Sequence, residues 1–269
     1  MTLWRHTAAG WAEGATVAVS SGTGSGDQFT RLVKGTGATV TALAAAARGG
    51  ASKGLRMYGT DVQHASAGWD VATVVDSIAM SCFLATDTIP SADFRRLVQS
   101  YGGAGSSSSP RIVAMANGSL AFLDAAAGTV ATTAAQALAQ WQAGFEIRLY
   151  AARATTNPTT ANGSLQAWIK RLSDSAIIMD TGLVAGNARV DGFQDGEFGR
   201  IPGSVSWTGH VDVSYPTIAT GADATGLVDP VPAAAAATGV YYSANGSTLT
   251  AGTLYYSSNG TTLTPISVM

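Results

Sequence analysis

Apolar and charged side chains alternate along the stretch FEIRLYA, residues 145–151. Its odd positions are apolar, and the two charged residues, Glu146 and Arg148, stand between them. Successive side chains of a β-strand point to opposite faces, so this pattern predicts one buried face and one hydrated face, as in an antiparallel sheet. Glu146 and Arg148 are expected to pair on the hydrated face. The stretch LQAWIKRL, residues 165–172, repeats the alternation in a weaker form.

Short stretches of β-type sequence follow one another on both sides, separated by turn residues. They cover residues 38–44, 54–58, 71–84, 94–101, 110–116, 119–124, 144–152, 163–172, 176–180, 195–201 and 210–218. Strands at this spacing favour an all-β fold, a two-sheet antiparallel jelly-roll sandwich over residues 29–221. The pair Asn117-Gly118 is typical of a tight hairpin turn. Residues 125–140 fit either a helix or an edge strand followed by a turn and a second strand.

Both ends of the chain differ in composition from this central region. Residues 1–28 contain two tryptophans and then the run SSGTGSG, which predicts an N-terminal docking arm with a flexible loop. Residues 222–237 contain DPVP followed by five alanines and are expected to form a Pro/Ala linker. The predicted order is therefore arm, sandwich, linker and a C-terminal segment.

An internal repeat occupies that segment, residues 238–269. The stretch VYYSANGSTLT, residues 240–250, recurs as LYYSSNGTTLT, residues 254–264. Each copy places Asn-Gly between a Tyr-Tyr strand and a Thr-Leu-Thr strand, which predicts tandem β-hairpins with type I′ turns. A lone hairpin is marginally stable in water, so we expect these two to pack on each other or on another chain. The candidate docking residues are its tyrosines: Tyr241, Tyr242, Tyr255 and Tyr256.

Charged residues make up 12% of the 269 residues, about half the usual share, and the net charge is −2. Such a chain has no basic field for nucleic acid, and no apolar run approaches the roughly 20 residues of a membrane helix. The N-terminus lacks the basic and apolar regions of a secretory signal peptide, which indicates synthesis in a cytoplasm. The single cysteine, Cys82, excludes an intramolecular disulfide and is interpreted as an inert core thiol.

No combination of residues typical of a catalytic site is found, so we expect no enzymatic activity, no cofactor and no metal. The paired carboxylates of sandwich glycoside hydrolases, Glu-x-Asp-x-x-Glu, are absent, as is the Gly-x-Ser-x-Gly nucleophile motif. The best acidic group is Asp191, Asp195 and Glu197, interpreted as solvated loop charges, with a catalytic carboxylate pair or a weak calcium site as the alternatives. The histidines lack metal-ligand spacing and are interpreted as structural or surface groups: His6, His64 and His210.

Six tryptophans are the other candidate functional residues. Two lie in expected strands and are assigned to the core: Trp141 and Trp168. Two lie near expected loops, where they either stack on a sugar ring or close the ends of the sandwich: Trp69 and Trp207. Two lie in the N-terminal arm, whose residues 1–19 we expect to dock into another protein or protomer: Trp4 and Trp11.

The order of four segments resembles the concanavalin A-like, laminin-G-type jelly-roll domain of virion proteins of tailed bacteriophages. These segments are WQAGFEIRL at 141–149, NGSLQAWI at 162–169, FGR at 198–200 and HVDVS at 210–214. The C-terminal repeat resembles the small β-repeats that end some phage tail and fibre proteins.

The resemblance implies a structural role on the surface of the virion, as a minor tail or fibre-associated protein. A capsid decoration protein or head fibre is the alternative within that class. The implied partners are other virion proteins or copies of the same chain. A carbohydrate-binding module for host cell-surface glycan is the alternative from another class, and a glycoside hydrolase ranks third.

Overall fold

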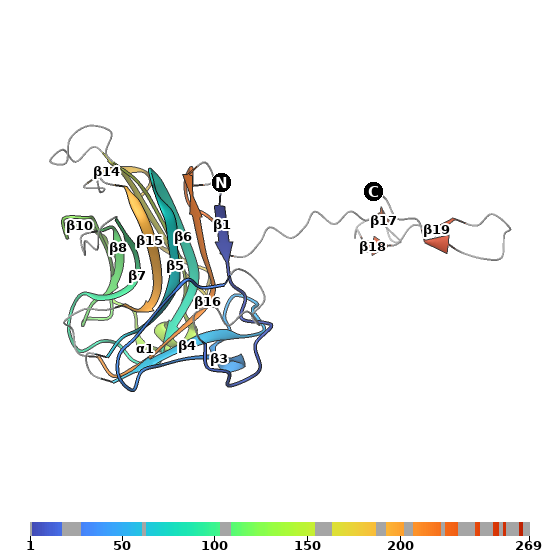
Figure 1. Ribbon diagram of the computed structural model, residues 1–269, viewed down its shortest axis with the longest axis horizontal. Helices are drawn as coiled ribbons and strands as arrows, with labels where there is room; N and C mark the ends of the chain where they lie inside the picture. Colours follow the sequence, from blue (N-terminus) through green and yellow to red (C-terminus); the bar gives the residue numbers. More distant parts are fainter. Residues whose placement is uncertain are drawn as a thin grey trace. The chain divides into compact units, whose positions relative to one another are not determined.

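The computed structural model describes residues 2–17, 28–60, 63–102, 109–153, 163–186, 192–201, 207–221 and 224–230, together with short strands at 240–242, 250–252, 255–256 and 264–265. The chain divides into two compact units, Met1–Pro230 and Val231–Met269. The described part of the first unit is nearly all β and forms two antiparallel sheets packed as a sandwich (Figure 1), so the predicted fold class is confirmed.

One sheet, here the β16 sheet, contains the stretch FEIRLYA. Its strands run in the order β13 (Ile177–Asp180), β12 (Gly163–Arg171), β11 (Phe145–Ala152), β6 (Ser77–Thr86), β16 (Gly209–Thr220), β4 (Gly54–Gly59) and β3 (Thr39–Leu43). Two further strands pair with β16 and β12 respectively: β1 (Thr2–Arg5) and β14 (Val184–Gly186).

The other sheet, here the β15 sheet, packs against it. Its order is β10 (Thr129–Thr132), β9 (Leu120–Leu123), β8 (Arg111–Ala114), β7 (Arg95–Tyr101), β15 (Phe193–Arg200), β5 (Ala65–Val75) and β2 (Arg31–Lys34). The described helices are short: η1 (Ala44–Ala46) and α1 (Leu138–Ala143).

The core follows from the period-two alternation. In β11 the odd residues, Phe145, Ile147 and Leu149, are fully buried between the sheets. Burial of each such side chain contributes about 2 kcal/mol relative to exposure. At Gly196 of β15 an added Cβ would lie 2.4 Å from Ile218 Cδ1 of the opposite sheet. Gly196 therefore faces the core, and its neighbours Asp195 and Glu197 face outward.

The expected N-terminal arm is wrong for its described part. Strand β1 pairs with β16 from Thr2↔Thr220 to Arg5↔Thr217. This edge is available because β4 pairs only with the first half of β16, up to Val213. Trp11 is 6% exposed and stacks on His6 at 4.4 Å, so it belongs to the sandwich's own core. Residues 18–27 lie outside the described residues.

The expected linker is also wrong in its first half. Residues 224–230, here the strap, lie on the outer face of the β16 sheet. Ala224 is 2% exposed and packs with Ala79, Tyr150 and Ala219, and Leu227 and Val228 pack beside them. The small side chains of Ala79 and Ala219 leave an apolar patch that the strap covers. Residues 222–223 and 231–237 lie outside the described residues.

The two remaining sequence predictions concern turns and short elements. The hairpin at Asn117-Gly118 is confirmed, since β8 and β9 pair on either side of it and Gly118 has φ +84°. Residues 125–140 contain the expected edge strand, β10, followed by the start of helix α1 instead of a second strand. Helix α1 buries Trp141, whose Nε1 donates to the Gly118 carbonyl at 3.0 Å.

The described part of the C-terminal repeats contains two antiparallel strand pairs, but of the expected Thr-Leu-Thr strands only Thr250 and Thr264 lie in them. Strand β17 (Val240–Tyr242) pairs with β18 (Thr250–Gly252), and β19 (Tyr255–Tyr256) pairs with β20 (Thr264–Pro265). The Asn-Gly turns and the side chains of the four tyrosines lie outside the described residues, so their docking role stays a prediction.

Candidate functional site

A cluster of charged side chains lies on the outer face of the β15 sheet. Asp195 of β15 is directly opposite Asp70 of β5 on one side and Tyr101 of β7 on the other. Glu197 of β15 is opposite Gly68 of β5, which on its other side is opposite Arg31 of β2. Residues that are opposite each other on neighbouring strands share a face. The Arg31 cluster is therefore built from four strands: Arg31, Asp70, Tyr101, Asp195 and Glu197.

Arg31 lies at the centre of this cluster. Its Nη1 is 2.9 Å from Asp195 Oδ2 and 3.6 Å from Asp70 Oδ1, and its Nε contacts Glu197 Oε1. The guanidinium lies over the Tyr101 ring, 5.1 Å from the centroid. Glu197 is fully buried and also accepts hydrogen bonds of 3.2 Å from the hydroxyls of Ser66 and Tyr101. The interpretation of Asp195 and Glu197 as solvated loop charges is wrong.

Burial and the neighbouring charges shift the pKa values of three groups in the Arg31 cluster. Burial first, and then the neighbouring Asp70, raise the pKa of the Asp195 carboxyl from 3.8 to about 6, although Arg31 opposes them. Burial and Glu197 together raise the pKa of the Tyr101 hydroxyl. Burial lowers the pKa of Arg31, but the charges of Glu197 and Asp195 outweigh it and the net direction is upward.

The arrangement disfavours the alternative of a calcium site on these carboxylates, because the positively charged Arg31 guanidinium already lies among them. In the described ranges no group of three or more His, Cys, Asp or Glu residues has the arrangement of a metal site. Asp191, the third member of the sequence-predicted acidic group, lies outside those ranges.

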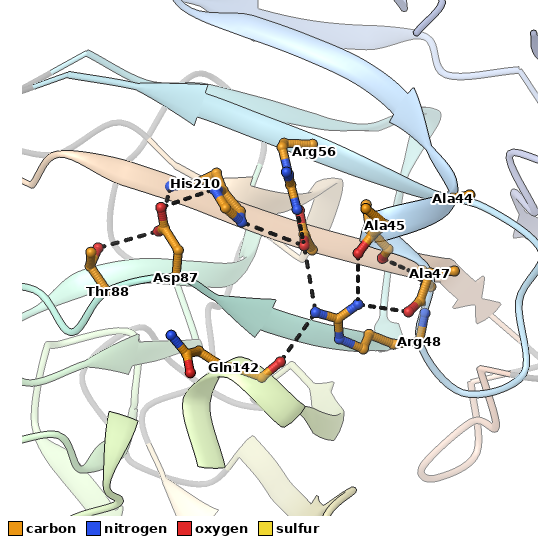
Figure 2. A network of polar contacts seen from close by, with 12 residues as sticks. Ala44, Ala45, Ala47, Arg48, Arg56, Asp87, Thr88, Gln142 and His210 are labelled. Carbon is orange, nitrogen blue, oxygen red and sulfur yellow. Dashed lines mark hydrogen bonds and ion pairs between the residues drawn. The ribbon is translucent and has the colours of Figure 1, made fainter. Parts of the chain in front are cut away.

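A second polar network, here the Asp212 network, surrounds a buried carboxylate on the outer face of the β16 sheet (Figure 2). Arg56 Nε and Nη2 donate to Asp212 Oδ1 and Oδ2 at 2.8 and 2.9 Å. Arg48 Nη2 lies 3.7 Å from Asp212 Oδ2, and His210 Nε2 lies 3.6 Å from the same atom. Burial raises the pKa of Asp212, but the hydrogen bonds from Arg56 and His210 outweigh it, so the pKa is lowered.

His210 lies between two carboxylates, with Nδ1 3.0 Å from Asp87 Oδ2. A carboxylate and a histidine are two parts of a hydrolase triad, which also needs an available hydroxyl. The next outward side chain of β16, Ser214, donates to the Ala46 carbonyl at 3.2 Å and accepts from the Arg48 amide at 3.0 Å. These hydrogen bonds hold the η1 segment against the sheet and already engage the Ser214 hydroxyl, so the structural role expected for His210 stays a prediction.

Arg48 extends the same network to neighbouring elements. Its Nη1 donates to the carbonyls of Ala45 and Ala47, at 3.0 and 2.7 Å, and its Nη2 donates to the carbonyl of Gln142 in α1 at 3.1 Å (Figure 2). Arg48 thus contacts η1, α1 and β16 at the same time.

A third group of charges, here the Arg148 network, holds the strap. Arg148 contacts Glu146 of its own strand, as predicted from the sequence, and its Nη2 lies 2.5 Å from Asp229 Oδ1. Glu146 is 4% exposed and also pairs with Lys170 at 2.7 Å, so the expected pair lies on the outer face but is covered. Arg5 of β1 donates to the Asp229 carbonyl at 2.6 Å.

Two tryptophan assignments need correction here. Trp168 was expected in the core, but it is half-buried on the outer face, where the Arg148 guanidinium lies 4.6 Å from its ring. It occupies an even position of β12, whose odd residues face the core. Trp4 is half-buried in β1, opposite Ile218, and packs against the core.

The proposed glycan-stacking tryptophans are both buried, so neither is available to a sugar ring. Trp69 lies in β5, fully buried, with its ring 4.7 Å from that of Phe29, and its Nε1 donates to the Gln28 carbonyl. Trp207 is 2% exposed, and its Nε1 donates to Thr88 Oγ1 at 2.8 Å. The sequence placed Trp69 near a loop, but it lies within β5 and belongs to the core.

Cys82 lies on the inner face of β6, fully buried. Burial raises the pKa of its thiol, which keeps it protonated and unreactive, as predicted.

Most of the partners in these networks carry no local sequence signal. Arg31, Asp70 and Tyr101 come from three strands, and only the strand register brings them to Asp195. The strap contacts depend on Arg5 and Asp229, which lie near opposite ends of the sandwich unit. The Asp-Pro pair at 229–230 is typical of a linker and by itself does not indicate contacts with Arg5 or Arg148.

No family model and no curated protein matches this chain. Among solved structures, alginate lyase Aly36B has a TM-score of 0.47 at 8% identity, covering 83% of this chain and 98% of its own. The PL-14 alginate lyase from Aplysia kurodai has a TM-score of 0.45 at 9% identity, covering 68% and 87%. A Trypanosoma rangeli sialidase has a TM-score of 0.44 at 12% identity, covering 80% of this chain and 30% of its own. Similarities this distant assign no activity.

Proposed function

We propose that the chain is a non-enzymatic structural component of a tailed-bacteriophage particle, a minor tail or fibre-associated protein displayed on the particle surface. The observation that carries this proposal is the division into a β-sandwich unit, Met1–Pro230, and a separate repeat-bearing unit, Val231–Met269. A protein of two units in series suits a role in which one unit attaches to the particle and the other is presented. The partners are then other virion proteins or copies of this chain.

The use of charge within the sandwich supports a structural role. In the Arg31 cluster and the Asp212 network, carboxylates accept hydrogen bonds from neighbouring arginines and hydroxyls. These contacts join strands β2, β5, β7 and β15 in one sheet and β4 and β16 in the other. Polar groups that are satisfied by each other rigidify a fold, whereas catalytic groups are directed at a substrate.

The central test uses purified particles of the phage that encodes this chain. Gold-labelled antibodies against the sandwich unit are expected to mark the tail in a fixed copy number per particle. Labelling of the head shell would favour the capsid-decoration alternative. Recovery of the protein only in the particle-free fraction would contradict a virion role.

Two assays on the purified full chain separate the other classes. A glycan array is expected to show no saturable binding. Saturable binding would favour the carbohydrate-binding alternative, for which the buried Trp69 and Trp207 no longer provide a platform. Cleavage of any polysaccharide in a panel that includes alginate would overturn the non-enzymatic part of the proposal.

A further inference from the structure

The peptide bond between Asp229 and Pro230 lies at the end of the sandwich unit. That unit ends at Pro230, and it contains every described strand from β1 to β16. A break at this bond would separate the repeat unit from the sandwich without interrupting any of these strands.

Aspartate followed by proline is chemically suited to such a break. The aspartate carboxylate can reach its own carbonyl carbon in a five-membered ring, so the attack is intramolecular. The proline nitrogen is a tertiary amide without N–H, and it leaves as a secondary amine that takes up a proton readily. Fold-dependent cleavage then requires that the chain hold the carboxylate and stabilise charge on the carbonyl oxygen.

The strap provides contacts of both kinds. Arg5 Nη2 donates to the Asp229 carbonyl oxygen at 2.6 Å, where negative charge would develop during the attack. Arg148 Nη2 lies 2.5 Å from Asp229 Oδ1 and holds the carboxylate, whose side chain is 66% exposed to water. On the other side of the bond, Pro230 is buried and its carbonyl accepts from Thr217 Oγ1 at 3.3 Å. The bond is thus fixed on both sides by described residues.

We propose that Asp229–Pro230 is a self-cleavage site through which the sandwich releases the C-terminal unit. The side-chain carboxylate of Asp229 attacks its own carbonyl carbon, the C–N bond to Pro230 breaks, and the proline nitrogen takes a proton from solvent. One water then hydrolyses the cyclic anhydride, leaving the side-chain carboxyl and a new C-terminal carboxyl on Asp229. The net reaction is hydrolysis of one peptide bond and requires no cofactor. It is independent of the virion role proposed above.

The test follows the intact full chain by mass spectrometry in mildly acidic and in neutral buffer, native and unfolded in urea. Products 1–229 and 230–269 are expected, faster in acid because the leaving nitrogen needs a proton. The native chain is expected to cleave at least about tenfold faster than the urea-unfolded chain at the same pH. An equal or slower native rate would mean that the fold protects an ordinary Asp-Pro bond, and the proposal would be wrong.

Variants separate the fold-dependent chemistry from loss of structure. Arg5→Met is expected to reduce the native rate about tenfold and leave the rate in urea unchanged. Asp229→Glu keeps the charge for Arg148 but requires a larger ring, and should abolish cleavage. The matched control is Arg153→Met, which removes a surface arginine paired with Asp76 and should cleave like the parent. Thermal melts confirm that each variant is folded. An unchanged native rate in folded Arg5→Met would overturn the proposal.

Discussion

Protonation of the Asp195 carboxyl is expected to make the stability of the sandwich depend on pH. Its pKa is raised from 3.8 to about 6, chiefly by burial. The folded chain therefore holds this proton more tightly than the unfolded chain, and stability falls as pH rises from about 4 to about 6. Asp195→Asn mimics the protonated form and is expected to raise the free energy of unfolding by about 1 kcal/mol above about pH 6. Urea unfolding across this pH range measures the effect.

The control for this experiment is Asp76→Asn, at a carboxylate whose side chain is 72% exposed and paired with Arg153. It should leave the slope between about pH 4 and about pH 6 as in the parent. If Asp195→Asn keeps the parental slope instead, another group is responsible for it.

Asp212 is expected to respond in the opposite direction. Its pKa is lowered in the folded chain despite burial, because Arg56 and His210 donate hydrogen bonds to it. Its contribution to stability is therefore present above its unfolded pKa of 3.8 and is lost as pH falls through the lower folded value. Asp212→Asn leaves the Arg56 guanidinium without its counter-charge and should destabilise the chain by about 3 kcal/mol at neutral pH. A double-mutant cycle with Arg56→Met checks this, and additive effects would contradict a direct pair.

At the scale of elements, the contact of β5 with β15 depends on a glycine. A Cβ added to Gly68 would lie 1.8 Å from the backbone oxygen of Gly196, which cannot move without separating the strands. Gly68→Ala is expected to destabilise the sandwich by about 3 kcal/mol, measured by urea unfolding. Gly226→Ala in the strap is the matched control, because among the described residues no atom beyond its chain neighbours lies within 4 Å of its added Cβ. Equal stability of the two variants would show that the strands adjust easily.

The elements could be predicted from the sequence because each strand has its own local pattern. The alternation at 145–151 identified β11 and its buried face. Trp168 was assigned wrongly because its apolar character was given more weight than its even position in β12. For residues 125–140 a helix was one of two alternatives, and the sequence could not place α1 at Leu138–Ala143 because six residues are too few for a helical period to be recognised.

At the scale of the whole molecule, the sequence could not predict the charged networks or the strap. Arg31 meets Asp195 only through the register of β2, β5 and β15, which no local pattern specifies. In the same way, β1 and the strap belong to the sandwich because β16 extends beyond β4 and its sheet has a small-residue patch. Both features depend on how distant segments meet, so composition alone suggested an arm and a linker.

This organisation predicts where the chain can be shortened. Residues 1–230 retain the strap, the sandwich core and the contacts of Arg5 and Arg148 with Asp229. Their melting temperature at neutral pH is therefore expected to lie within about 2 °C of that of the full chain. Residues 1–221 lose the strap and its packing on Ala79 and Tyr150, and should be less stable by about 2 kcal/mol. Scanning calorimetry of the three chains compares them, and equal stability of 1–221 and 1–230 would show that the strap contributes nothing to the sandwich.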